Sequence, residues 1–196
     1  MQQHAARLVH GKNILELGAG AGLPSLVAAT LGAKKVVVTD YPDAELVENL
    51  RLNIEGCELL EHVGERGIVA EGYLWGADDT AVVRHLPNGY DRFDTLILAD
   101  LLFNHHCHSA LVATILKTLS RAPEARALVL FTPYRPWLLE KDMAFFDLCR
   151  EAGLRVEKVV QERMKKVMFA EDRGDEGLRR TVFGFELSWR DLGEGE

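Results

Sequence analysis

The sequence predicts an α/β fold in which a mostly parallel sheet of seven strands is covered by helices on both faces and ends in an antiparallel hairpin. Short runs rich in Val, Ile and Leu alternate with longer segments of helical periodicity, which is typical of parallel sheets buried on both faces. The last two strand-like segments have no helical segment between them, which indicates a hairpin. With 196 residues, 47% of them hydrophobic, the chain can bury a substantial core, and we expect one domain over residues 1–196.

The first half of the chain predicts two strand–helix units and a third strand. The strands are expected at 13–17, 35–40 and 67–75, and the helices between them at 24–33 and 43–54. Gly32 ends the first helical pattern, since glycine adopts the left-handed conformation that often follows a helix. Asp43 is the expected N-cap of the second helix.

The second half continues the alternation and then departs from it. Strands are expected at 93–100, 125–133, 154–164 and 181–189, and helices at 108–121 and 137–153. Gly153 closes the last of these helices. The segment 165–180 carries Gly174, Gly177 and many charges, so we interpret it as a long hairpin connection rather than a crossover helix. The final strand is therefore expected to run antiparallel to the others.

Composition excludes several classes of protein. The net charge of −7 argues against a general binder of polyanions, because phosphate contacts need clustered Lys and Arg; it permits a basic partner. The three cysteines, Cys57, Cys107 and Cys149, are scattered and odd in number, which fits a reducing compartment. No apolar run approaches the roughly 20 residues that span a bilayer, and the start of the chain has no signal-peptide apolar region. We expect a cytoplasmic protein without a membrane partner.

A glycine-rich loop, "ELGAGAG" at 16–22, follows the first strand. Glycines at this place allow a tight turn and let backbone N–H groups approach a ligand. A dinucleotide fingerprint would require a glycine where Leu23 stands. Asp40 ends the second strand, where its carboxylate can accept both hydrogen bonds of a ribose diol, although an N-cap or a surface turn is the alternative role. Loop and acid together predict an adenosine-type ligand.

At these residues the chain resembles the class I S-adenosylmethionine-dependent methyltransferases. "ELGAGAG" is similar to their first motif, Asp40 to their ribose-binding acid, and the terminal "LRVEKVV" and "TVFGFELSW" to their antiparallel seventh strand. The resemblance covers nearly the whole chain and implies a Rossmann-like fold. It is strongest with the seven-β-strand lysine methyltransferases, and among them with the fungal enzymes that methylate the N-terminus and a lysine of elongation factor 1-alpha, some of which carry an older nicotinamide N-methyltransferase label. The stretches that support it are "ILELGAGAGLPSL", "VVVTDYPD", "LADLLFNH" and "FTPYRPWLLEKD".

The resemblance implies S-adenosyl-L-methionine as cofactor and a protein substrate, elongation factor 1-alpha. The residues expected to bind the cofactor are Glu16, Gly18, Ala19, Gly20, Gly22, Asp40, Tyr41, Trp75 and Ala99. Trp75 would stack on the adenine ring or lie at its edge, and a buried structural tryptophan is the alternative. Asn49 and Asn53 would support the ribose loop, unless they are surface polar residues.

The end of the fourth strand carries the predicted chemistry. Asp100, Phe103 and Asn104 follow it, and ligands of open α/β sheets lie outside the carboxyl ends of strands. Relatives have an aromatic residue three positions after an acid, and "DLLF" fits this pattern. Because the attacking amine must be neutral, a group near Asp100 is expected to take or orient its proton. The alternative is that Asp100 caps the next helix and Phe103 belongs to the core.

Two further segments complete the prediction. Tyr134 and Arg135, in "TPYRPW" after the fifth strand, are expected to shape the substrate entrance; the alternative is a proline-bounded loop with Trp137 packed on the core. The cluster "NHHCH" at 104–108 contains metal-ligand types. Neighbouring residues there point in different directions and no second cluster supplies further ligands, so we expect no metal.

Other functions stay open at this level. They are a small-molecule methyltransferase of the nicotinamide type and a cofactor-binding scaffold without activity. The scaffold alternative arises because only residues 1–12 precede the first strand, whereas the family carries a longer N-terminal segment, part of which we expect this chain to lack. Methylation of nucleic acid is disfavoured by the charge and by "DLLF" at the fourth strand, and an NAD-dependent dehydrogenase by Leu23 and the terminal hairpin.

Overall fold

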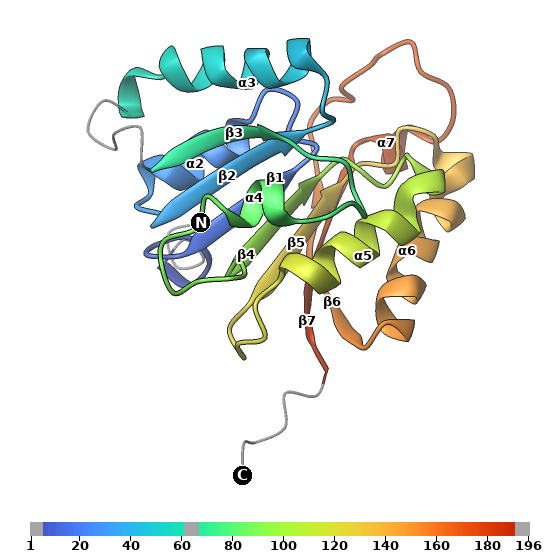
Figure 1. The fold of residues 1–196 in the computed structure, drawn as a ribbon. Helices are drawn as coiled ribbons and strands as arrows, with labels where there is room; N and C mark the ends of the chain where they lie inside the picture. Colours follow the sequence, from blue (N-terminus) through green and yellow to red (C-terminus); the bar gives the residue numbers. More distant parts are fainter. Residues whose placement is uncertain (1–5, 61–66, 191–196) are drawn as a thin grey trace.

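The computed structural model describes residues 6–60 and 67–190 and contains one seven-stranded sheet with the strand order β3-β2-β1-β4-β5-β7-β6 (Figure 1). The strands are β1 (Asn13–Leu17), β2 (Lys35–Asp40), β3 (Ile68–Gly72), β4 (Thr95–Ala99), β5 (Arg126–Phe131), β6 (Leu154–Arg163) and β7 (Thr181–Trp189). Strands β1 to β5 pair in parallel, and β7 lies antiparallel between β5 and β6. The predicted fold class, including the antiparallel hairpin, is confirmed.

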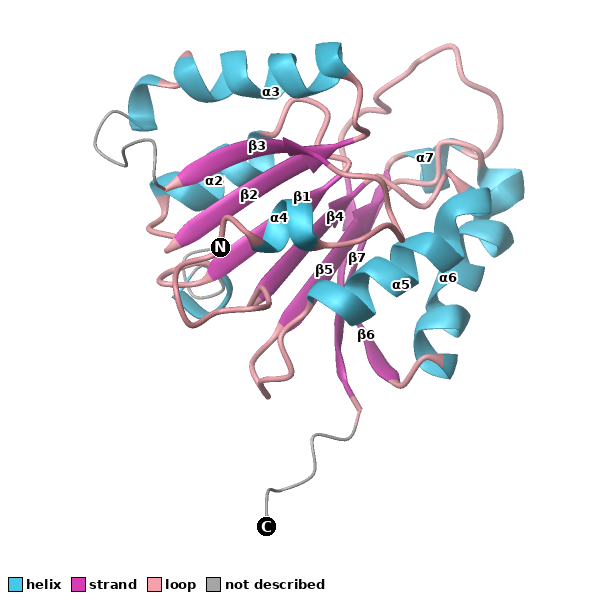
Figure 2. Cartoon of the chain, viewed as in Figure 1, coloured by secondary structure: helices cyan, strands magenta, loops and turns pink. Residues whose placement is uncertain are grey.

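Helices cover both faces of this sheet. They are α2 (Leu23–Thr30), α3 (Ala44–Glu55), α4 (Thr80–Val83), α5 (His108–Thr118), α6 (Leu139–Glu151) and α7 (Glu176–Arg179), with 3-10 turns η1 (Glu58–Leu60), η2 (His105–Cys107) and η3 (Pro136–Leu138). In Figure 2, α4 and α5 lie in front of the sheet and α2 lies behind it. No described helix is long and apolar enough to cross a membrane.

Alternating residues of the central strands divide the core into two layers. Leu15 and Val37 pack with α4, α5 and α6 on one face, whereas Ile14 and Val36 pack with α2 and α3 on the other. All four side chains are fully buried. Because successive side chains of a strand point to opposite faces, a strand covered on both sides must be apolar throughout.

The helix boundaries follow from their caps. The Asp43 carboxylate accepts hydrogen bonds from the backbone N–H groups of Glu45 (2.9 Å) and Leu46 (3.4 Å), so the predicted N-cap of α3 is confirmed. The predicted helix 137–153 begins with the 3-10 turn at Pro136, and α6 proper starts at Leu139. The one-turn helices α4 and α7 were not predicted, because four residues are too few to show helical periodicity.

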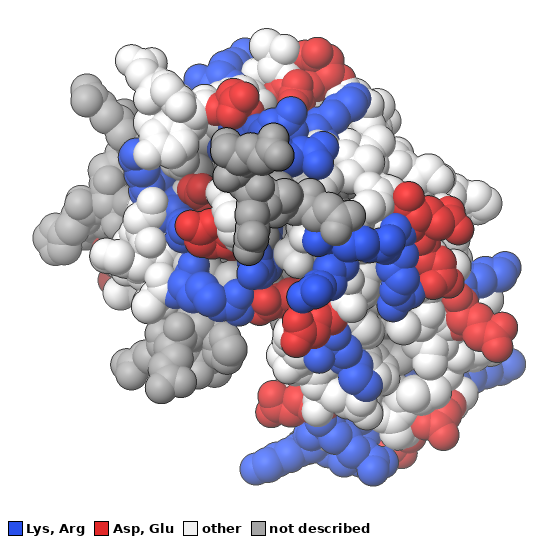
Figure 3. All heavy atoms as spheres, turned by 90° about the horizontal axis from the view of Figure 1, so that it is seen from below, with Lys and Arg blue, Asp and Glu red and all other residues white. Residues whose placement is uncertain are grey.

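The strand predicted at 67–75 is shorter than expected. It ends at Gly72, and the following residues leave the sheet at the carboxyl edge, where the loops after β1, β2 and β4 also lie. Seen from below (Figure 3), Lys and Arg side chains lie interspersed with Asp and Glu. The net charge of −7 is therefore not gathered into a single-sign surface on that face.

Candidate active site

The glycine loop turns from β1 into α2 through three left-handed residues. Gly18, Gly20 and Gly22 have φ values of +58°, +57° and +75°. A side chain at Gly18 would place its Cβ 2.6 Å from Leu101 Cδ2, so Leu101 would have to shift, in addition to the backbone conformation that favours glycine there. At Gly20 a Cβ would meet no atom within 4 Å, which leaves this part of the loop open to a ligand.

Asp40 ties this loop to the end of β2. One carboxylate oxygen accepts from the Gly20 N–H at 2.7 Å, and the other accepts from the Tyr41 N–H at 2.7 Å. The Asn53 side chain donates to the carbonyl of Ala21 at 3.0 Å and braces the loop from α3. Each carboxylate oxygen has a further lone pair, so Asp40 can still accept from a diol.

These segments enclose a cavity of about 430 Å³, here called the loop cavity. Its lining consists of Gly18, Gly20, Asp40, Tyr41, Tyr73, Leu74, Trp75, Asp100, Leu101, Phe103, Asn104, Cys107 and Ala110. Five of the predicted cofactor residues and all three predicted catalytic residues lie here. The remaining lining residues were missed. Tyr73, Leu74, Leu101 and Cys107 lie within or beside predicted motifs, which was their one signal, whereas Ala110 comes from α5 and had none.

Four predicted cofactor residues do not line the loop cavity. Glu16 is only 1% exposed and accepts a hydrogen bond from the Ser25 N–H of α2 at 2.9 Å. Burial raises its pKa to about 7, although the hydrogen bonds from Ser25 oppose this. Ala19 packs against the core beside α2, Gly22 is the N-cap residue of that helix, and Ala99 lines a separate chamber.

Asp100 has the most constrained backbone in the site. Its φ of +55° makes it the one non-glycine residue with a positive φ among residues 6–60 and 67–190, a conformation that costs on the order of 1–3 kcal/mol. Its carboxylate accepts from the Thr132 N–H (2.9 Å) and the Tyr134 hydroxyl (3.2 Å), and its own N–H donates to Leu130 O (2.7 Å). Asp100 therefore does not cap the next helix, because its side chain is held by the loop after β5.

The predicted substrate residues contact the predicted catalytic ones. Besides the bond from Tyr134 to Asp100, Arg135 donates to the carbonyl of Phe103 at 2.9 Å. Burial and the neighbouring carboxylate raise the pKa of Tyr134 to about 12, so the phenol stays protonated and donates. Phe103 is 59% exposed and Trp137 62% exposed, which contradicts the alternative that places either ring in the core.

A second hollow, the hairpin chamber, also has Asp100 in its lining and has a volume of about 310 Å³. Residues of the connection between β6 and β7 form part of its wall. Its lining consists of Ala99, Asp100, Leu130, Phe131, Thr132, Tyr134, Met164, Lys166, Met168, Arg179, Arg180 and Val182. Since Asp100 lines both hollows, it lies where their contents would meet.

The histidines after Asn104 have structural partners. His105 Nε2 lies 2.7 Å from Asp142 Oδ1, and His108 Nε2 lies 2.8 Å from the carbonyl of Leu102. Burial lowers the pKa of His108 and raises that of Asp142. In the described part of the chain, no group of three or more His, Cys, Asp and Glu could hold a metal ion.

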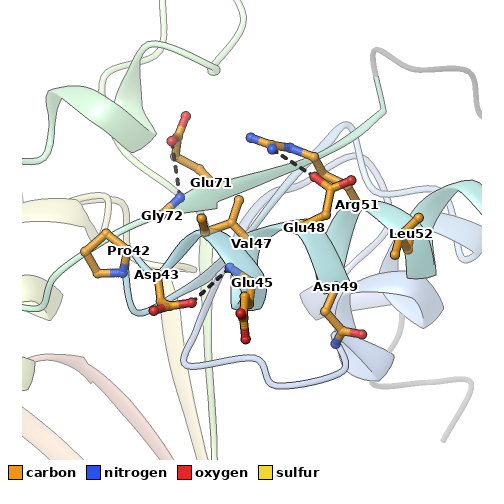
Figure 4. Close-up of a pocket in the computed structure, with 11 residues that line it drawn as sticks. Pro42, Asp43, Glu45, Val47, Glu48, Asn49, Arg51, Leu52, Glu71 and Gly72 are labelled. Carbon is orange, nitrogen blue, oxygen red and sulfur yellow. Dashed lines mark hydrogen bonds and ion pairs between the residues drawn. The ribbon is translucent and has the colours of Figure 1, made fainter.

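A larger, more open hollow of about 860 Å³ lies between α3 and the edge of β3 (Figure 4). Its acidic side chains already have partners. Asp43 caps the helix, Glu48 pairs with Arg51 at 3.2 Å, and Glu71 lies 2.8 Å from His85 Nε2. Asp100 does not line this hollow, so the loop cavity and the hairpin chamber are the stronger candidate for the site.

Comparisons with known proteins show which family the chain is similar to. A family profile described as "Lysine methyltransferase" matches residues 1–152. The "Protein N-terminal and lysine N-methyltransferase efm7" of Neurospora crassa is 51% identical over 186 residues, covering 92% of this chain and 66% of the relative. The protein of the same name from Emericella nidulans is 44% identical over 194 residues, covering 97% and 75%. The chain thus spans about two thirds of the Neurospora protein.

Solved structures share the fold at low sequence identity. YcgJ from Bacillus subtilis superimposes with a TM-score of 0.67 at 13% identity, covering 97% of both chains. A "SAM dependent methyltransferase" from Aquifex aeolicus superimposes with a TM-score of 0.59 at 13% identity, covering 95% of this chain and 87% of the other. At such identity the likeness concerns the fold alone.

Proposed function

The chain belongs to the lysine methyltransferase family, and from this membership we propose that it is an S-adenosylmethionine-dependent N-methyltransferase of protein amines. The family recognised in the sequence is thereby confirmed, as is its place among methyltransferase enzymes. The observation that supports the proposal best is the position of Asp100, which lines both the loop cavity and the hairpin chamber. Two substrates of a transfer reaction must meet at one point, and these hollows provide it.

The loop cavity fits the proposed cofactor. Its volume of about 430 Å³ lies in the range of small-molecule sites, roughly 300–1,000 Å³. Asp40 would accept the ribose diol, Trp75 would contact the adenine, and the open face of Gly20 would admit the ligand against the backbone. When bound, the cofactor would supply a methyl group on a positively charged sulfur, and the lone pair of the amine would bond to the methyl carbon as the C–S bond breaks.

The residues of this chain would then position the amine and manage its proton. A protonated amine has no lone pair, so the proton must leave before transfer. Asp100 is the carboxylate shared by both hollows, and we assign it the role of orienting the amine and accepting that proton. Tyr134, which stays protonated because of its raised pKa, and Thr132 fix the direction of the carboxylate. Phe103 and Asn104 would line the path of the amine.

The acceptor that we propose is the N-terminal amine, an adjacent lysine, or both, of elongation factor 1-alpha. The printed names of the relatives support protein N-terminal and lysine methylation. The choice of this factor rests on the resemblance of "VVVTDYPD", "LADLLFNH" and "FTPYRPWLLEKD" to the fungal enzymes. A cytoplasmic location agrees with such an acceptor.

Intact-mass analysis of recombinant elongation factor 1-alpha tests this proposal. After incubation with the protein and S-adenosylmethionine, we expect the mass to rise by one or more methyl groups, which peptide mapping places at the N-terminal segment. A reaction without cofactor is the control.

Three outcomes would contradict parts of the proposal. Methylation of nicotinamide but not of the factor would identify a small-molecule enzyme. Cofactor binding without methylation of either acceptor would identify an inactive scaffold. Calorimetry that detects no binding of S-adenosylmethionine would overturn the cofactor assignment.

A further inference from the structure

The hairpin chamber has a charge opposite to that of the whole chain. Among residues 6–60 and 67–190, its charged lining residues are three cations and one carboxylate: Lys166, Arg179, Arg180 and Asp100. The carboxylate of Asp100 already accepts from the Thr132 N–H and the Tyr134 hydroxyl. Although the chain has a net charge of −7, the lining of this hollow beside Asp100 is cationic. Such a local charge favours an anionic ligand.

Arg179 is the most buried of these cations. Its residue is 7% exposed, one terminal nitrogen donates to the carbonyl of Phe169 at 2.8 Å, and its buried Nε has no hydrogen-bond partner among the described residues. A buried guanidinium with an unmet donor is costly unless an acceptor, best an anionic one, completes it. Arg179 also lines the hairpin chamber, so an anion bound there would compensate the charge of the guanidinium.

The other two cations of the chamber, Arg180 and Lys166, differ in their interaction partners. Arg180 forms an ion pair with Glu176 at 3.1 Å and donates to the carbonyl of Met164, so its charge is already compensated. Lys166 is exposed on the β6–β7 connection and has no ion pair in the part of the chain that the structure describes. Arg179 and Lys166 therefore leave two positive charges facing one chamber.

We propose that Arg179, assisted by Lys166, binds a carboxylate of the acceptor polypeptide and thereby selects amines that have an Asp or Glu nearby in sequence. The inference rests on the proposed function, since it concerns the acceptor side of the same site. A peptide carbonyl in the chamber would leave the charge of Arg179 uncompensated, whereas a carboxylate would compensate it and accept a charge-assisted hydrogen bond. The cofactor's own carboxylate is a less suitable ligand, because Arg179 does not line the loop cavity.

Paired peptides test this selection without relying on turnover. Each peptide has a free N-terminal amine followed by a lysine, and a single Glu is moved through the next positions, with a Gln peptide as the partner of each. Calorimetry in the presence of S-adenosylhomocysteine measures the dissociation constants. For at least one position we expect the Glu peptide to bind the wild type about tenfold more tightly than its Gln partner, as a charge-assisted hydrogen bond allows.

Variants of the protein test whether Arg179 is the residue that causes the preference for Glu peptides. Arg179→Met is expected to abolish the preference for Glu while leaving the affinity for S-adenosylhomocysteine unchanged, and Arg179→Lys to restore part of it. Arg155→Met, which removes a charge from the exposed face of β6, is the matched control and should keep the full preference. If Arg179→Met does not fold, Arg179→Lys and Lys166→Met provide the test, each with a reduced preference.

Several results would overturn the inference. Equal binding of Glu and Gln peptides at every position contradicts it, as does an undiminished preference in Arg179→Met. Loss of S-adenosylhomocysteine binding in a folded Arg179 variant would assign the arginine to the cofactor's carboxylate instead. Failure of the wild type to methylate any peptide or the elongation factor would contradict the proposed function, whereas the dissociation constants would still judge Arg179.

Discussion

The loop cavity and the hairpin chamber meet at Asp100, yet they are built in different ways. The loop cavity depends on backbone conformation, because left-handed glycines and two N–H groups bonded to Asp40 shape it. The hairpin chamber depends on side chains, mostly from β5, the loop after it, β7 and the β6–β7 connection, and these include two methionines and three cations. The first kind of site suits a constant ligand and the second a variable one, so we infer a fixed cofactor on one side of Asp100 and a selected acceptor on the other.

The largest expected effect falls on the residue that the two hollows share. Asp100→Asn should lower the rate of methyl transfer about a thousandfold, because the amide cannot accept the proton of the amine. Asn tolerates the positive φ of this position, so the fold should persist. Single-turnover assays measure the rate, and calorimetry should find cofactor binding unchanged. A variant that transfers methyl groups at the wild-type rate would remove Asp100 from the chemistry.

The next effect concerns the stability of the loop-cavity side. Burial raises the pKa of Glu16 from 4.5 to about 7, so the folded protein holds a proton that the unfolded chain releases. The resulting stabilisation is fully present below pH 4.5 and is lost as the pH rises through about 7. Glu16→Gln, which is always neutral, should therefore exceed the wild type in free energy of unfolding by an amount that grows to about 3 kcal/mol above pH 7.

Urea denaturation without cofactor at a series of pH values measures this difference. Glu55→Gln, at the exposed end of α3, is the control and should follow the wild type throughout. A constant difference between Glu16→Gln and the wild type from pH 4.5 to 8 would show that the buried carboxyl does not titrate as described.

Asp40 tests whether the loop cavity alone holds the cofactor. Asp40→Ala should weaken binding of S-adenosylhomocysteine by roughly 2–3 kcal/mol, because a charged acceptor of two hydroxyl groups is lost and the Gly20 N–H is released. Asp43→Asn, which preserves the cap of α3 on the same loop, is the matched control. Equal affinities in calorimetry for Asp40→Ala and wild type would contradict the ribose role.

The smallest expected effect is a difference in stability between variants at two glycines of the same loop. Gly18→Ala should lower the free energy of unfolding by about 2–3 kcal/mol, because the methyl group meets Leu101 in addition to the strained φ. Gly20→Ala has the same φ strain but open space, so about 1 kcal/mol is expected. Its main consequence should be weaker cofactor binding, since Gly20 lines the loop cavity and an added methyl group would occupy space open to the ligand. Thermal unfolding and calorimetry of the pair distinguish these effects, and equal losses of stability would contradict the packing argument.

Short-range patterns explain why several residues of the candidate site could be predicted to lie close together. The glycine loop, Asp40 and the "DLLF" segment each follow a buried strand, and strands that pair in parallel bring their carboxyl ends to one edge. Among the predicted cofactor residues, Glu16 is the one whose position such patterns predict least well. In an alternating strand its side chain faces α2, and only packing shows that it meets Ser25 rather than the loop cavity.

The sequence by itself determined the order of strands and helices, the glycine loop and the terminal hairpin, because each depends on residues that are close together in the chain. Only the tertiary structure decided which residues hold the Asp100 carboxylate. The pairing of β4 with β5 brings Thr132 and Tyr134 to its carboxylate, and the return of β7 beside β5 places Arg179 under the same edge. These contacts join residues that are far apart in the sequence. Local sequence patterns do not show which of these residues strand pairing will bring together.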